Sequence, residues 1–292
     1  MGVVESTIQE THIARLQSQP VRLQEYGVGI FGKIATKSAL KKAIKKDLIY
    51  VNSKVASTAT MIQGGETITL YQSVEKPNKR EFTLSLEVIF EDDHLAVINK
   101  PAGVLVSGNA FKTIANALSQ NLKKSTAADA VDPKPIHRLD FPTTGILLIG
   151  KTAASITALN TLFENKKISK TYYAVTIGKM KKVEEIVAPI NGKIASTKLK
   201  IIDSITSVRF EHLNLVKLIP KTGRRHQLRK HLAELGNPIL GDADYGTEGK
   251  ILKGKGLYLH AFSLEFTHPI TKDKLHFEKE LPKKFNKLFA VC

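Results

Sequence analysis

The sequence has one cysteine and no long apolar run, and these two absences restrict the class of protein. Cys292 cannot form an internal disulfide, and a zinc site that uses several thiolates is excluded. No apolar run approaches the roughly 20 residues of a membrane-spanning helix, and no basic segment followed by an apolar one opens the chain. We therefore expect a cytoplasmic protein that is not bound to a membrane.

Acidic residues are also scarce relative to basic ones. The chain has 27 Asp and Glu against 44 Lys and Arg, which gives a formal net charge of +17. Such a charge attracts polyanions, with nucleic acid as the first expectation and an acidic membrane surface as the second. A Walker loop, a dinucleotide-binding fingerprint and a Cys/His cluster are missing. The sequence therefore indicates no metal and no cofactor.

The length of 292 residues favours two domains. A polar stretch with a proline predicts a linker at 76–85, between a small unit at 21–75 and a larger one at 86–292. Residues 1–20 are polar and lack a clear period, so we expect a mobile leader or a short helix there. A monomer is the default expectation.

The small unit contains a basic helix followed by two strands. Thr36 can cap a helix in which Leu40, Ala43 and Ile44 share the apolar side. Two apolar segments, at 48–53 and 67–71, are typical of short strands. The remaining surface of the helix is a basic patch with no acidic residue before Asp47: Lys37, Lys41, Lys42, Lys45 and Lys46.

The most informative stretch of the larger unit, residues 135–150, reads PIHRLDFPTTGILLIG. A polar segment with one carboxylate, Asp140, leads through a turn into the four apolar residues 146–149, which predict a buried strand. Binding and catalytic groups are often held on such loops. Asp140 could equally cap the turn through its side chain as an Asx residue.

Around this stretch the pattern alternates between strands and helices. Segments 84–90 and 95–98 predict a hairpin with a solvated acidic turn at 91–94, and residues 125–135 predict a loop. Helices are expected at 113–124, 153–166 and 224–235, the last with Arg225 and Arg229 on one side. Strands are expected from residue 170, across 183–220 and at 257–266. In the first of these, Tyr172 and Tyr173 point to opposite faces.

Two separated motifs resemble the RluA-type pseudouridine synthases. Residues 137–145 match His-Arg-Leu-Asp, two residues, Thr-Ser-Gly, with Thr144 in place of Ser. Residues 223–229 match Gly-Arg-Thr-His-Gln-Leu/Ile-Arg, with Arg225 in place of Thr. Shorter matches lie at 99–103, 170–174 and 259–261. The resemblance extends from about Leu86 to the C-terminus.

This resemblance implies an α+β fold, with a mixed, largely antiparallel sheet flanked by helices, and an enzyme that isomerises uridine in RNA without a cofactor. Asp140 would be the catalytic carboxylate, Arg229 the cation that grips it with two hydrogen bonds, and Tyr172 the ring that stacks on the extruded base. The carboxylate could attack the sugar or the base, or remove a sugar proton, and the sequence leaves these routes open.

The same resemblance implies that Arg138 fills the gap left in the RNA, with Arg224 and Arg225 as further RNA contacts. Residues 21–72 resemble the alpha-L RNA-binding module of a small-subunit ribosomal protein, on the elements 49–53 and 65–68. The basic patch of this module would then bind RNA, with ribosomal RNA favoured and transfer RNA possible.

Two other functions compete with this interpretation. One is a catalytically silent protein that binds RNA or assists ribosome assembly, which the intact Asp140, Tyr172 and Arg229 argue against. The other is a metal-free RNA hydrolase that relies on histidines. The candidates for that role are His137, His226, His231 and His260. We interpret these histidines as structural residues rather than as ligands or catalysts.

Overall fold

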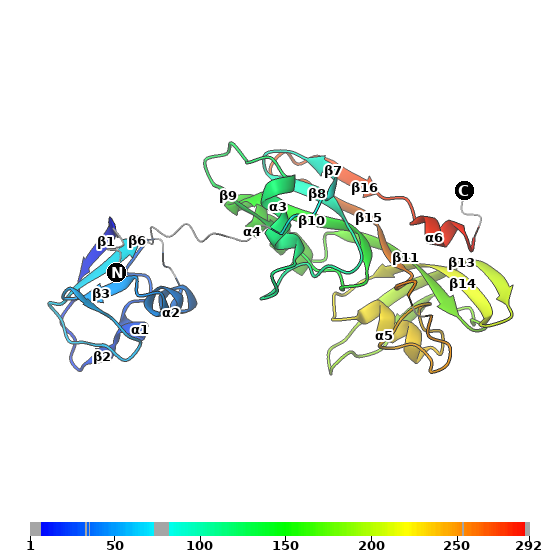
Figure 1. Ribbon diagram of the computed structural model, residues 1–292, viewed down its shortest axis with the longest axis horizontal. Coiled ribbons are helices and arrows are strands. Elements are labelled where there is room, and N and C mark those ends of the chain that lie inside the picture. The colour runs from blue at the N-terminus through cyan, green and yellow to red at the C-terminus, as the bar shows by residue number, and fades with distance from the viewer. Residues whose placement is uncertain (1–6, 33, 35, 73–81, 253, 290–292) are drawn as a thin grey trace. The chain divides into compact units, whose positions relative to one another are not determined.

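The computed structural model describes residues 7–32, 34, 36–72, 82–252 and 254–289 (Figure 1). The chain divides into two compact units, residues 1–80 and 81–292. Cys292 and residues 76–81 of the expected linker lie outside the described residues. Residues 82–86 are already part of the larger unit. The amide side chain of Asn121 holds them, because it donates to Leu84 O at 2.7 Å and accepts from Leu86 N at 2.8 Å. The linker expected at 76–85 therefore ends earlier than predicted.

The smaller unit is a twisted sheet covered by short helices. Its four-stranded sheet has the order β1-β6-β3-β4, and β2 pairs separately with β5. Leu40, Ala43 and Ile44 of the second helix are buried against this sheet, and Thr36 caps that helix by accepting from Ala39 N, as predicted. The elements are β1 (Thr7–Ile13), β2 (Val21–Arg22), α1 (Leu23–Tyr26), α2 (Lys37–Lys45), β3 (Ile49–Val51), β4 (Lys54–Val55), β5 (Met61–Ile62) and β6 (Thr67–Gln72).

The expectation of a mobile leader or short helix at 1–20 was wrong for the residues that the structure describes. Residues 7–13 form β1, which pairs antiparallel with β6 from Thr7 opposite Gln72 to Ile13 opposite Thr67. This strand lies at the sheet edge and leaves Ile8 61% exposed. Its main-chain hydrogen bonds, rather than an apolar face, hold it in place, so the sequence shows no alternation.

The larger unit is built on a ten-stranded sheet. Its main path is β12-β13-β14-β11-β15-β10-β8-β7, with β16 added to β15 and β9 added to β10. Only the β10–β15 pair is parallel, so the sheet is mixed and largely antiparallel, as predicted. The strands are β7 (Glu87–Glu91), β8 (Leu95–Lys100), β9 (Ala130–Pro135), β10 (Thr144–Thr152), β11 (Ser169–Ile177), β12 (Glu185–Val187), β13 (Ser196–Ser207), β14 (Glu211–Pro220), β15 (Leu259–Thr267) and β16 (Lys274–Glu278).

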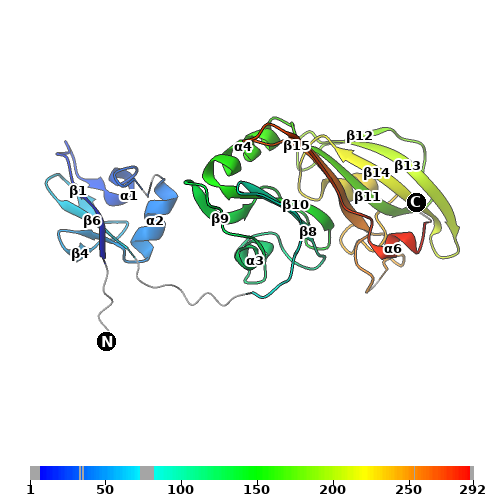
Figure 2. The ribbon, with the colours of Figure 1, turned by 90° about the horizontal axis from the view of Figure 1, so that it is seen from above.

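Helices cover both faces of the sheet around β10. Figure 2 shows α3 (Ile114–Asn121) and α4 (Ala153–Glu164) on opposite sides of this strand. Accordingly Leu147 and Ile149 belong to the apolar cluster that includes α3, whereas Ile146 and Leu148 belong to the cluster that includes Leu159 of α4. The apolar run 146–149 is continuous because both of its faces are buried. The remaining helices are α5 (Gln227–Glu234) and α6 (Lys283–Asn286).

Gly145 allows β10 to begin beside β15. Its φ is +111°, and a Cβ atom at this position would collide with the carbonyl group of Ala261. Gly145 lies opposite Ala261 in the parallel pair, so the glycine of the first motif is required by the close approach of two main chains. This contact fixes the point at which the Asp140 loop enters the sheet.

The loop expected at 125–135 was partly wrong, because residues 130–135 form β9. This strand pairs antiparallel with β10, with Pro135 opposite Ile149 and Ala130 opposite Thr152. Among the described strands, β10 is its one partner. An edge strand tolerates Pro133 and Pro135, because a proline whose nitrogen faces away from the neighbouring strand removes no hydrogen bond of the sheet.

Candidate active site

The predicted site residues of the larger unit line one cavity of about 1840 Å³. Asp140 comes from the loop before β10, Tyr172 from β11 and Arg229 from α5. The other predicted residues that line it are Arg138, Arg224 and Arg225. Long-range pairing of β10, β11 and β15 therefore brings together two motifs that are far apart in the sequence.

Asp140 presents its carboxylate to this cavity and is 26% exposed. The turn is closed by the main chain, because Thr143 N donates to Asp140 O at 3.0 Å. Because no main-chain N–H among the described residues donates to the Asp140 side chain, the Asx alternative is wrong. The basic groups within 4 Å of the carboxylate among the described residues are Arg229 Nη1, 3.7 Å from Oδ2, and the His226 ring, whose Nε2 lies 3.8 Å from Oδ1. Both distances exceed hydrogen-bond length.

A buried lysine fixes the loop that carries Asp140. Lys100 Nζ donates to Pro101 O at 2.8 Å, Thr143 O at 2.9 Å and Phe141 O at 3.2 Å. Burial lowers the pKa of Lys100 to about 8, against the opposing charge of Asp140. Sequence reasoning assigned no role to Lys100. The available signal was its place in the Asn-Lys-Pro-x-Gly element at 99–103, at the end of a strand whose first four residues are apolar.

Arg229 does not grip Asp140 as predicted. Its two-pronged contact is with Asp242, from Nε to Oδ2 at 2.7 Å and from Nη2 to Oδ1 at 2.6 Å. Nη2 also donates to Asp244 Oδ2 at 2.6 Å. The edge of the guanidinium formed by Nε and Nη2 is thus occupied, and only Nη1 approaches Asp140. Burial lowers the pKa of Arg229, but the hydrogen bond and charge of Asp242, the hydrogen bond of Asp244 and the charge of Asp140 outweigh this effect and raise it.

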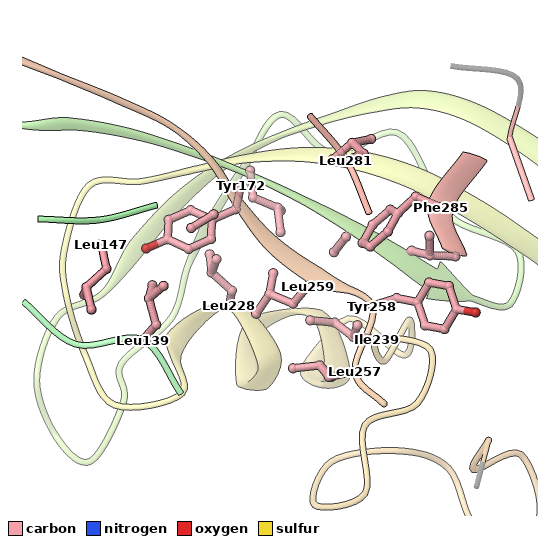
Figure 3. Packing of buried hydrophobic residues seen from close by; sticks show 14 of the residues in the cluster. Leu139, Leu147, Tyr172, Leu228, Ile239, Leu257, Tyr258, Leu259, Leu281 and Phe285 are labelled. Carbon is pink, nitrogen blue, oxygen red and sulfur yellow. The ribbon is translucent and has the colours of Figure 1, made fainter. Parts of the chain in front are cut away.

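Tyr172 lies in the apolar wall of the cavity. Figure 3 shows its ring beside Leu139, Leu147 and Leu228, with which it shares the large apolar cluster. Burial, followed by the charge of Asp140, raises the pKa of Tyr172, so its hydroxyl is neutral at physiological pH. Tyr173 points to the opposite face and packs edge-on against Phe262. The structure thus places Tyr172, and not Tyr173, in the cavity.

Comparison with known proteins identifies the family. The model of the RNA pseudouridylate synthase family matches residues 94–234, which include Asp140, Tyr172 and Arg229. A ribosomal large subunit pseudouridine synthase C of Rickettsia bellii is 33% identical over 286 residues, which cover 87% of this chain and 93% of the relative. The chain belongs to the RNA pseudouridylate synthase family. A ribosomal large subunit pseudouridine synthase D of Vibrio cholerae is 33% identical over 278 residues, which cover 85% of this chain and 84% of the relative.

Solved structures confirm the fold predicted for this pseudouridylate synthase. Human RNA Pseudouridylate Synthase Domain Containing 4 superposes with a TM-score of 0.54 at 27% identity, over 68% of this chain and 90% of that protein. Human RNA Pseudouridylate Synthase Domain Containing 1 superposes with a TM-score of 0.58 at 23% identity, over 70% and 87%. The chain is therefore an RNA-modifying isomerase with an α+β catalytic domain.

The second motif of this synthase departs from the predicted helix. His226 has a φ of +56°, so α5 begins at Gln227 rather than at Arg224. Arg224 and Arg225 therefore lie on the preceding loop, and the expectation that Arg225 shares a helix side with Arg229 was wrong. The side chain of Gln227 stabilises this loop, because its Oε1 accepts from Arg224 N at 3.0 Å.

The histidines of the synthase fall into two groups. His137, His231 and His260 bond within the fold: His137 Nε2 accepts from Leu148 N at 3.1 Å, His231 Nδ1 lies 3.0 Å from Thr197 Oγ1, and His260 Nδ1 lies 2.7 Å from Thr144 Oγ1. Burial lowers the pKa of His137 to about 3 and that of His260 to about 4.

His226 differs from these because its ring faces Asp140 in the cavity. Its Nδ1 lies 2.9 Å from Tyr245 Oη, and its Nε2 faces Asp140. Burial lowers the pKa of His226, and the charge of Asp140 opposes this effect. The structural interpretation of His226 therefore needs correction, since α5 does not include it and its ring reaches the site.

The site also contains Asp242, which sequence reasoning missed. Its side chain is fully buried, and besides binding Arg229 it accepts from Asp244 N at 3.0 Å and Tyr245 N at 3.1 Å. A buried carboxylate needs a cation and hydrogen-bond donors, and both are present. The only signal in the sequence is an acidic pair in the glycine-bounded segment 241–246.

Among the residues that the structure describes, no group of three or more His, Cys, Asp and Glu side chains is arranged to hold a metal ion. Within the same described ranges, no helix has the length and apolar character needed to cross a membrane.

Proposed function

We propose that this synthase converts specific uridines of large-subunit ribosomal RNA to pseudouridine, with Asp140 as the catalytic carboxylate. The relatives named for the ribosomal large subunit match over most of the chain and support this substrate. The observation that carries the assignment of Asp140 is its carboxylate, which faces the cavity from a pinned loop without a hydrogen bond to the described residues. A ribosomal substrate would also account for a cytoplasmic location.

The reaction breaks the bond between ribose C1′ and uracil N1 and forms a bond from C1′ to C5 of the same base. A carboxylate can serve as nucleophile on the sugar or base, or as base toward a sugar proton. Arg229 Nη1, 3.7 Å from Asp140 Oδ2, places a positive charge beside the carboxylate without occupying either oxygen as a hydrogen-bond donor. Both oxygens of Asp140 therefore remain open to the substrate.

Tyr172 is proposed to contact the extruded uracil. Taking a base out of folded RNA costs a few kcal/mol, which contacts in the pocket must offset. Only 9% of Tyr172 is exposed, so it can touch a base that has entered the cavity but not one that stays outside. Its neutral hydroxyl is a hydrogen-bond donor.

RNA binding is proposed to use the cations of both units. Arg138 lies exposed on the Asp140 loop, and Arg224 and Arg225 lie on the facing loop of the same cavity. In the smaller unit, which we propose to be an alpha-L RNA-binding module, the basic patch is less uniform than predicted, because Lys37 Nζ lies 2.5 Å from Glu25. The exposed lysines of this module that would contact phosphates are Lys41, Lys42 and Lys45.

Mapping of pseudouridines tests this function. Ribosomal and transfer RNA from cells with and without the protein are compared, and the deleted strain is complemented with wild type or Asp140→Asn. We expect one or a few large-subunit sites to disappear and to return only with wild type. Loss confined to transfer RNA would overturn the substrate. Restoration by Asp140→Asn would overturn the catalytic role and favour a binding function.

A further inference from the structure

Phe141, which directly follows Asp140, holds an exposed aromatic ring in the same cavity. The residue is 52% exposed, whereas Tyr172 in that cavity is 9% exposed. Single exposed apolar residues are common on protein surfaces, so exposure alone carries no argument.

The main chain at Phe141 is fixed although its ring is free. Phe141 O accepts from Gly103 N at 2.9 Å and from Lys100 Nζ at 3.2 Å. None of the aromatic ring pairs among the described residues includes Phe141. A phenyl ring has only two side-chain torsions, so a flat ring on a rigid loop loses little entropy when it is covered.

Three cations that line the same cavity as Phe141 have no acidic partner among the described residues. They are Arg138 on the same loop and Lys221 and Arg225 on the facing one. By contrast, lysines that do not line the cavity form the ion pairs Lys151–Glu91, Lys250–Glu211 and Lys279–Glu87. An exposed ring among unpaired cations suits a polymer that offers both phosphates and flat bases.

We propose that Phe141 is a stacking platform for an RNA base next to the uridine that is isomerised. The identity of the polymer rests on the function proposed above, and the platform is a contact additional to Asp140, Tyr172 and Arg229. A base held on Phe141 keeps the flanking strand in place while the target uridine leaves its stack. Stacking depends on the face of the base rather than its edges, so this contact tolerates any neighbouring base.

Fluorescence tests the contact directly, because the chain contains no tryptophan. Phe141→Trp introduces a single indole at the platform, and Phe111→Trp is the matched control. Phe111 is 45% exposed, packs edge-on against Phe82 and does not line the cavity. The probes are a single-stranded oligouridylate of about 12 nucleotides, within the usual site sizes, and inorganic polyphosphate, which has the charge but no bases.

We expect oligouridylate to quench the indole of Phe141→Trp and polyphosphate to leave its emission unchanged. Neither probe should alter the emission of Phe111→Trp. Anisotropy of labelled oligouridylate reports when the full-length protein is saturated. An unquenched indole in Phe141→Trp at saturation, or equal quenching by polyphosphate, overturns the platform.

Kinetics on deproteinised large-subunit ribosomal RNA supply the second measurement. Phe141→Ala should lower kcat/KM about 5- to 150-fold, the range expected from the loss of one base–aromatic stack. Phe141→Tyr should recover most of this loss, and Phe111→Ala should match wild type. Unchanged kcat/KM in Phe141→Ala refutes the inference. Fluorescence requires no isomerisation. Quenching of the indole, together with no pseudouridine formed by wild type, would therefore overturn the proposed function but not the stacking contact.

Discussion

Asp242→Asn is the perturbation that tests how Arg229 is held. Asp242 is fully buried and meets Arg229 through two charge-assisted hydrogen bonds of 2.6 and 2.7 Å. Asparagine keeps the shape of the side chain but removes the charge and sets an amide N–H₂ against a guanidinium N–H. Arg229, which is 3% exposed, would then lose its only two-pronged partner among the described residues.

The loss of one member of a buried ion pair costs about 3 to 5 kcal/mol. Asp244 still accepts from Nη2, so we expect the lower end, about 3 kcal/mol. For a domain of this size, that corresponds to a fall in Tm of about 6 to 12 °C. The freed guanidinium should also turn toward Asp140 and occupy its carboxylate, so kcat should fall while RNA affinity is preserved.

The assay combines a thermal melt of the larger unit with single-turnover pseudouridine formation. Asp244→Asn is the matched control, because Asp244 binds the same Nη2 atom but is 60% exposed. An exposed partner contributes about 1 kcal/mol or less, so this variant should melt near wild type. An Asp242→Asn protein with unchanged Tm and unchanged kcat would show that Asp242 does not position Arg229.

Three further predictions concern pH, the Asp140 loop and RNA binding. Burial lowers the pKa of His260 to about 4. Below about pH 6.5, His260 therefore binds a proton in the unfolded chain but not in the folded chain. Stability should therefore fall between pH 6.5 and 4, and a flat Tm profile would contradict this. Lys100→Met removes three hydrogen bonds from the loop and should lower kcat about 100-fold at unchanged Kd for RNA; wild-type kcat would refute the anchoring role. Simultaneous alanine substitution of Lys41, Lys42 and Lys45 should lower the log–log salt slope of RNA binding by about 2. An unchanged slope would show that these lysines of the module do not contact the RNA.

The parts of the fold that were predictable are those in which the apolar pattern follows burial. The run 146–149 predicted a strand buried on both faces, and β10 lies between α3 and α4. Thr36 and Thr113 cap helices near the predicted starting points, because their hydroxyl groups accept from main-chain N–H groups at 39 and 116.

The edge strands were not predictable in the same way. β1 and β9 are held by hydrogen bonds to a single neighbouring strand, and such bonds involve main-chain atoms that every sequence has. Ile8 and Ile13 are exposed, and two prolines interrupt β9. Neither segment therefore shows the alternation that marks a strand with one buried face.

The sequence predicted which residues meet in the cavity, but not how they pair. The first motif contains Asp140 and the second contains Arg229, yet the sequence could not show which carboxylate contacts which edge of the guanidinium. That edge is decided by the turn at 241–245, which brings Asp242 to Arg229 only in the folded chain. The left-handed conformation of His226 was equally hidden, since no glycine marks it.

The central claim is that the carboxylate of Asp140 carries the isomerisation. The most direct measurement is single-turnover pseudouridine formation by purified Asp140→Asn on large-subunit ribosomal RNA, with RNA affinity measured in parallel. We predict a rate at least about 100-fold below wild type, with Kd essentially unchanged. Conversion of uridine at the wild-type rate by Asp140→Asn would contradict the account.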